Sequence, residues 1–164
     1  MTAKRGVRRY GTGRSKPRRG RSARQEAAIG ILRTADALRR HFDAVLEPRG
    51  ITSQQYNVLR ILRGAHPEAL PTMEIAERMI ERTPGITRLI DRLVEKGLVA
   101  RERCHEDRRR VRCSVTERGL ALLSLLDAPV DEADESALAM LDDREVDRLV
   151  AVLDRVREGH EARG

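Results

Sequence analysis

Three successive arginines stand in a short segment that contains no apolar residue. The segment is His105-Glu106-Asp107-Arg108-Arg109-Arg110, and it has nothing to contribute to a hydrophobic core. We therefore expect a solvated loop. A guanidinium is always charged and makes paired hydrogen bonds to phosphate oxygens, so the segment could bind a polyanion. A charge run alone could equally be a solubilising loop, and its flanks must decide between the two interpretations.

A second set of small and cationic residues stands at the start of a predicted helix. Thr83 has the side chain of an N-cap, Pro84 suits the first helical position, and Gly97 follows the end. Ile86, Leu89, Ile90, Leu93 and Val94 predict its buried face, and Gly85, Thr87, Arg88, Asp91, Arg92 and Glu95 its outer face. Small residues at a helix start allow close approach to a partner, and Arg88 could make paired bonds to it.

Apolar spacing predicts three helices before this one. The first runs from Ala23 to Glu47 and ends at Pro48-Arg49-Gly50, because proline cannot continue a helix. Thr52 is expected to cap the second, which stops near residues 64–67, and Thr72 a short third helix. The predicted inward residues are Ile31, Ala35, Leu38, Phe42 and Val45, then Tyr56, Leu59 and Leu62, then Ile75, Ala76 and Met79.

Two strands are predicted on either side of the arginine segment. Val111, Cys113 and Val115 alternate with polar residues, which is the period of a strand, and residues 98–104 form its partner. Thr116 should cap a fifth helix that breaks near Pro129. A capping-box pair, Asp142 and Glu145, precedes a sixth helix with Val146, Leu149, Val150, Leu153 and Val156 on one face.

A helix-turn-helix followed by a basic-tipped hairpin is a winged helix. We predict a mainly α fold with a small β-hairpin, a winged helix-turn-helix with N- and C-terminal dimerisation helices. The expected regions are a disordered basic N-terminal arm (1–22), an N-terminal dimerisation helix (23–50), the winged helix-turn-helix (51–119) and C-terminal dimerisation helices (120–164).

Four runs of sequence resemble the MarR family of bacterial regulators. They are TMEIAERM from Thr72, PGITRLIDRLVEKGLV from Pro84, EDRRRV from Glu106 and SVTERG from Ser114. The likeness covers about residues 26–160 in element order, and its specific motifs lie between residues 72 and 119. The resemblance implies that terminal helices of two subunits intertwine, that the fourth helix enters the DNA major groove, and that the wing contacts the minor groove.

The residues themselves agree with that implication. A major groove admits one helix, whose N-terminal residues reach base edges first, so Thr83, Pro84, Gly85, Thr87 and Arg88 are the expected contacts, followed by Arg92. A narrow, electronegative minor groove attracts arginine, and Arg109 is our candidate for insertion, with Arg108 and Arg110 on phosphates. The resemblance implies that Asp107 orients Arg109.

Charge is distributed unevenly along the chain. The formal net charge is +7, yet residues 1–24 hold ten Lys or Arg and no acid. Residues 82–118 hold eleven basic and six acidic side chains, whereas residues 127–161 hold four and twelve. We expect one face to meet phosphates and another to turn away. No apolar run approaches a membrane span and no signal peptide is evident, so we expect a cytoplasmic protein without a membrane partner.

Other kinds of site are weakly supported. Cys113 lies on the apolar alternation, whereas Cys104, beside Arg103 and His105, could be a redox sensor; we favour a structural role for both. The histidines lack ligand spacing, so no metal is predicted, and no motif indicates an enzyme or a cofactor. The resemblance implies a small phenolic or anionic effector in a cleft between the dimer helices and the DNA-binding lobe, and Phe42 and Tyr56 are the candidate residues for such a ligand here.

We therefore predict a homodimeric, sequence-specific regulator of transcription that binds a pseudo-palindromic operator on double-stranded DNA, mostly as a repressor that responds to a ligand or to stress. One alternative is a non-specific nucleic-acid packaging or RNA-associated protein, suggested by the arginine-rich arm. Another is a winged helix used only for protein contacts, which would not need both Arg88 and Arg109.

Overall fold

The computed structural model describes residues 20–81, 84–103 and 111–161. Side chains are described for the same residues except Arg103 and Glu161. The chain divides into two compact units, Met1–Ala37 and Leu38–Gly164. The first described element, α1 (Ala23–Leu46), crosses that boundary, and all the other elements belong to the second unit.

The start of the chain folds as its punctuation predicts. Helix α1 passes into a short 3-10 turn, η1 (Glu47–Arg49), and Gly50 follows in the left-handed region with φ 71°. Helix α2 (Ser53–Ala65) then begins with a complete capping box: Thr52 accepts a hydrogen bond from the Gln55 amide, and the Gln55 side chain accepts one from the Thr52 amide. Both boundaries are therefore set by local chemistry.

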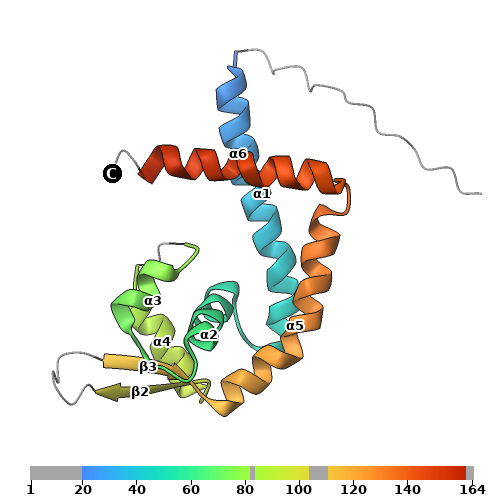
Figure 1. Ribbon diagram of the computed structural model, residues 1–164. Helices are drawn as coiled ribbons and strands as arrows, with labels where there is room; N and C mark the ends of the chain where they lie inside the picture. The colour runs from blue at the N-terminus through green and yellow to red at the C-terminus, as the bar shows by residue number, and fades with distance from the viewer. Residues whose placement is uncertain (1–19, 82–83, 104–110, 162–164) are drawn as a thin grey trace, which may run out of the picture. The chain divides into compact units, whose positions relative to one another are not determined.

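The sheet has one more strand than the predicted hairpin. Strands β2 (Val99–Arg103) and β3 (Val111–Val115) pair antiparallel, with Val99 opposite Val115. The third strand, β1 (Leu70–Pro71), pairs with the other edge of β3. A strand of two residues is too short to show an alternating pattern, so the sequence could not predict β1. It is a strand because it pairs with β3. Figure 1 shows β2 and β3 projecting together from this part of the fold.

Helix α3 (Thr72–Arg78) follows β1 directly, and its predicted cap was wrong by one residue. Pro71 occupies the N-cap position and makes no side-chain cap bond, so Thr72 is already inside the helix. The Thr72 hydroxyl instead lies 3.9 Å from the Cys113 sulfur on β3. Strand pairing places Pro71 where the chain turns into the helix, and this tertiary constraint outweighs the capping preference of threonine.

One hydrophobic core joins the last turn of α1, α2, α3, α4 (Ile86–Glu95), the sheet and α5 (Glu117–Leu138) as far as Val130. We call these elements the central lobe (Figure 1). The buried side chains are aliphatic, as the near absence of aromatic residues requires. The most deeply buried members are Leu46, Val58, Leu59, Leu62, Ile75, Ile90, Leu93, Cys113, Leu123 and Leu126.

Helix α5 does not break at Pro129, contrary to the prediction. Thr116 caps it by accepting a hydrogen bond from the Gly119 amide, and the helix runs through Pro129 to Leu138. Proline removes one backbone bond and clashes with the preceding turn, which usually bends a helix. Figure 1 shows that α5 changes direction along its length. Buried residues on both sides of the proline, Leu126 and Val130, account for its continuity.

The last helix, α6 (Asp143–Glu161), begins with the predicted reciprocal cap. The Asp142 carboxylate accepts from the Glu145 amide at 2.9 Å, and the Glu145 carboxylate accepts from the Asp142 amide at 3.1 Å. Among the described residues of its predicted apolar face none is fully buried: Val146, Leu149 and Leu153 are partly buried, and Val150 is 52% and Val156 42% exposed. Part of this face is therefore accessible to another surface.

Candidate nucleic-acid interface

Helix α4 carries most of the predicted interface, but it starts later than expected. Its first residue is Ile86, and its N-cap is Gly85, with φ 96° and no side-chain cap bond. The prediction of Pro84 as the first helical residue was therefore wrong, and Thr83 lies outside the described residues. A left-handed backbone at this cap favours glycine, which explains why the helix begins there.

The two faces of α4 separate as their residue types predict. Leu89, Ile90 and Leu93 are buried in the core of the central lobe. Val94, predicted to be buried, is 37% exposed, because the core ends before the last turn. The predicted contact residues lie on the accessible side: Pro84, Gly85, Thr87, Arg88 and Arg92 are all exposed.

The far end of α4 is held by main-chain and side-chain bonds. The Gly97 amide donates to the Val94 carbonyl at 2.8 Å and the Leu98 amide to the Leu93 carbonyl at 2.9 Å, which is a Schellman motif. Gly97 has φ 68°, as this motif requires. Lys96 Nζ donates to the Gly50 carbonyl at 2.5 Å and to Gln55 Oε1 at 3.1 Å. The helix is thus fixed at the end away from its exposed start.

A charged pair joins α4 to the hairpin. Arg101 Nη1 on β2 donates to Asp91 Oδ1 at 2.6 Å. The helical spacing predicts Asp91 on the outer face, and no pattern in the sequence indicates a role for Arg101. The pairing depends on the angle between helix and strand, which no spacing in the sequence reveals. The pair links β2 to α4 at the surface of the central lobe.

The hairpin carries the predicted wing. β2 and β3 are paired as far as Arg103 and Val111. Residues 104–110 lie outside the described part of the chain, and with them the predicted wing contacts and the candidate redox residue. These are Asp107, Arg108, Arg109 and Arg110, together with Cys104.

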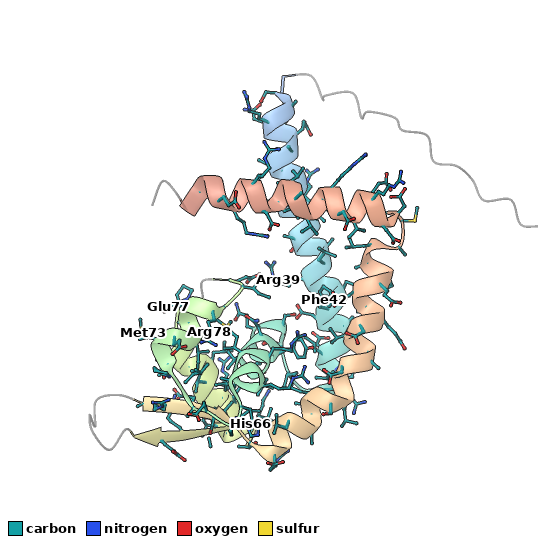
Figure 2. All side chains as sticks on the ribbon, in the orientation of Figure 1. Arg39, Phe42, His66, Met73, Glu77 and Arg78 are labelled. Carbon is teal, nitrogen blue, oxygen red and sulfur yellow. The ribbon has the colours of Figure 1, made fainter. Side chains whose placement is uncertain are left out.

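Two exposed apolar side chains near α4 were not predicted as site residues. Met73 on α3 is 69% exposed, and Ile80, between α3 and α4, is 86% exposed. Figure 2 shows Met73 on α3 together with Glu77 and Arg78. Asn57 Oδ1 on α2 accepts from the Ile80 amide at 3.0 Å and so positions this connection. In the sequence, the only indication of these two residues is that each is apolar but lies outside the predicted buried stripe.

Phe42 and Tyr56, the candidate ligand residues, are both half-buried, and neither lines the two hollows that the structure describes. The Phe42 ring packs edge-on against His41, with centroids 5.8 Å apart. The Tyr56 hydroxyl accepts from Arg60 Nη1 at 3.3 Å, and this bond raises the pKa of Arg60. A hollow of about 90 Å³ between α1, α2 and the α3–α4 connection is lined by other residues: Arg39, Ser53, Gln54, Asn57, Met79, Ile80 and Glu81.

Cysteine and metal chemistry receive little support. Cys113 is buried on β3, in agreement with the structural role predicted for it. Across residues 20–81, 84–103 and 111–161, no three His, Cys, Asp or Glu side chains are grouped so that they could hold a metal ion.

A helix pair with an exposed second helix, followed by a small antiparallel sheet, defines a winged helix-turn-helix protein. Comparison with known proteins agrees with this class. Residues 51–111 match the model of the MarR family. The chain is 32% identical over 104 residues to the HTH-type transcriptional regulator FarR of Neisseria gonorrhoeae. The aligned residues make up 63% of this chain and 70% of FarR.

Solved structures give the same result over most of the chain. A MarR transcription factor from Planctomyces limnophilus is 40% identical, with a TM-score of 0.66 over 83% of this chain and 98% of that one. A mutant MarR from E. coli, complexed with operator DNA, is 25% identical, with a TM-score of 0.73 over 83% of this chain and 99% of that one.

The chain therefore belongs to the MarR family, and it is a DNA-binding regulator of transcription. None of the helices in the described ranges is both long and apolar enough to cross a membrane.

Proposed function

We propose that this protein binds a pseudo-palindromic operator as a homodimer, with the start of α4 in the major groove of each half-site. The observation that carries the proposal is the exposed start of a helix whose other face and far end are fixed. Leu89, Ile90 and Leu93 hold α4 against the core, while Thr87 and Arg88 face outward. A helix held in this way can present its first residues to base edges without losing much conformational entropy.

The arginines between β2 and β3 form the second part of the proposed interface. In this proposal Arg109 enters the minor groove, Asp107 orients it, and Arg108 and Arg110 contact phosphates. The antiparallel pairing of β2 with β3 and the bond between Arg101 and Asp91 support this arrangement, because they fix the base of the wing beside α4. Both elements would then meet one half-site together.

A two-fold symmetric dimer would bring two such units to the two half-sites. Support comes from α6, where Val150 is 52% exposed and Val156 42%, and from α1, where Ile31 is 41% exposed and Leu32 70%. The acidic residues 127–161 suit a segment that faces away from DNA. We propose repression as the mode of control, with modulation by a small molecule near Phe42 and Tyr56, and the cytoplasm as the place of action.

The test is a titration of the purified protein on the DNA that flanks its own coding region and on random DNA of equal length. A sequence-specific regulator should prefer its own site by a factor of at least about a thousand. Equal affinity for both would contradict the proposal and favour a packaging protein. Footprinting on the same fragment should show two protected half-sites about one helical turn apart.

Arg88→Ala tests the placement of α4. We expect a loss of about 1–3 kcal/mol on the operator and little change on random DNA, because a base contact carries specificity and a phosphate contact does not. Arg109→Ala is the comparison variant and should weaken both kinds of DNA. An equal loss of operator and random binding for Arg88→Ala would show that the start of α4 is not the element that recognises the bases.

A further inference from the structure

A larger hollow lies on the central lobe, where the α1–α2 connection, the end of α4 and the start of α5 meet. Its volume is about 400 Å³. Three cationic side chains line it: Arg49 before α2, Lys96 at the end of α4 and Arg118 in the first turn of α5. None of the described lining residues is acidic, and no ion pair of these three cations is found within the described part of the chain. The hollow is therefore a site of positive potential.

The floor between these cations is apolar. Ile51 and Leu98 are buried at 2% and 5% exposure, and they line the hollow together with Ala121, Leu122 and Leu125. Leu125 is 58% exposed, so part of this apolar surface meets solvent. A segment that covers the hollow would thus need apolar side chains for the floor and acidic ones for the rim.

The connection between α5 and α6 has this composition. We call residues 139–143 the α5–α6 corner. Met140 is 79% exposed and Leu141 37%, and the exposed acids Asp142 and Asp143 follow them directly. The Leu141 amide donates to the Leu138 carbonyl at 2.9 Å, and the capping box of α6 holds the next residues. A corner that is already ordered loses little conformational entropy on docking.

The corner cannot reach the hollow of its own chain. Arg118 lies in the first turn of α5 and Met140 just beyond its last residue, and α5 is a continuous helix of 22 residues. At about 1.5 Å per residue, such a helix spans roughly 30 Å. Figure 1 shows the start of α5 beside the sheet and its end at α6. Any corner that fills the hollow must therefore come from another copy of the chain.

We infer that the α5–α6 corner of a second copy docks in the larger hollow. Met140 and Leu141 cover the apolar floor, and Asp143 faces Arg49 and Arg118. The contact joins two different surfaces, so it is not self-complementary, and each pair keeps one free hollow and one free corner. It is distinct from the two-fold contact proposed above, and it would join one dimer to the next.

The contact leaves the proposed DNA-binding surface free. The exposed start of α4 is not among the residues that line the hollow. Association through the corner can therefore be measured without DNA. Failure of this association would leave operator binding as proposed, and failure of operator binding would leave the association intact.

Sedimentation velocity of the full chain, without DNA, tests the inference from about 1 μM to about 1 mM protein, which covers weak contacts. We expect the sedimentation coefficient to rise with concentration beyond the value of the dimer. The rise should be smaller in about 1 M salt than in about 0.1 M, because the screening length falls from about 10 Å to about 3 Å. A coefficient that never exceeds the value of the dimer would overturn the inference.

Three variants locate the contact. Arg118→Glu reverses a charge of the hollow, and Asp143→Arg reverses a charge of the corner. Met140→Ser removes an apolar side chain whose high exposure makes it unimportant for the fold. Each should weaken the association by about tenfold or more, since an ion pair becomes a repulsion or a buried apolar contact is lost. Full association of Arg118→Glu or of Asp143→Arg would place the contact elsewhere and overturn the assignment.

An equimolar mixture of the two charge-reversed chains separates pairing from misfolding. Every contact between unlike chains in this mixture again joins opposite charges, so the association should recover, which a structural defect would not allow. Arg155→Glu, on the exposed side of α6 opposite its apolar stripe, is the matched control and should associate as the unchanged chain does. A mixture that does not recover, or an equal loss in the control, would contradict the pairing of corner and hollow.

Discussion

Helices α4 and α6 carry similar apolar stripes, but their surroundings differ. In α4, Leu89, Ile90 and Leu93 are buried by α2, α3 and the sheet of the same chain. In α6 no described residue is buried, and Val150 and Val156 are about half exposed. A stripe therefore shows that a helix has a face to bury, but it does not show what will cover that face.

The difference has a consequence for stability. The central lobe closes its core with its own residues, so its folding should depend on packing within one chain. Helix α6 is formed by local chemistry, the capping box of Asp142 and Glu145, and would gain most of its tertiary stability from a partner. Substitutions in the central lobe should therefore alter the stability of the fold, whereas substitutions on α6 should alter dimerisation.

The largest effect is expected at Gly119 in the central lobe. A Cβ built there would lie 2.4 Å from the Leu98 carbonyl oxygen and 2.7 Å from a Val115 methyl group. Since backbone cannot move aside easily, Gly119→Ala should cost about 3 kcal/mol and lower the melting temperature by roughly 6–12 °C. Gly64→Ala in α2, where nothing lies within 4 Å of the added carbon, is the control and should raise stability slightly. Equal melting of the two variants would contradict the close packing of α5 on the sheet.

The next effect is expected on α6 and concerns assembly. Leu149→Asp places a charge on the apolar stripe and should weaken the dimer by about 2 kcal/mol, because a buried carboxylate without a partner is costly. Sedimentation velocity at micromolar concentration measures this. Ala151→Asp, on the opposite and exposed face of the same helix, is the matched control. A monomeric unchanged protein would refute the interpretation of the α6 stripe.

Deletion of residues 1–21 should have a smaller effect, confined to DNA affinity. An arginine-rich arm that contacts phosphates contributes about 0.9 to the slope of log affinity against log salt for each phosphate neutralised. We expect a shallower slope and a nearly equal loss on operator and random DNA, since such contacts carry no sequence information. Titrations at several salt concentrations give the slope. If the slope does not change, the arm does not contribute to binding.

The smallest effect is expected for the pair that joins α4 to the hairpin. Asp91 and Arg101 are partly exposed, with side-chain exposures of 43% and 30%. Asp91→Asn should therefore cost only about 0.2–1 kcal/mol of stability. Denaturant titration checks this, with Glu95→Gln on the exposed face of α4 as the control. A larger loss for Asp91→Asn would show that the central lobe depends on the hairpin for its stability, which the burial of its core does not suggest.

Local chemistry in the sequence determined several boundaries correctly. The capping boxes of α2 and α6, the Thr116 cap of α5, and the left-handed glycines at Gly50 and Gly97 act within a few residues, so no distant part of the chain has to be known. The alternation in β3 and the apolar spacing of α1, α2 and α4 follow from the geometry of a single element. The family motifs between residues 72 and 119 added the class of partner.

Tertiary structure decided the features that depend on residues far apart in the chain. Pro71 took the cap position predicted for Thr72 because β1 pairs with β3. Helix α5 continued through Pro129, with packed residues on both sides of it. The contact between Asp91 and Arg101, and the cations gathered around the larger hollow, arise where separate elements meet. Such contacts depend on the angles and distances between packed elements, and periodicity along one chain segment carries no information about either.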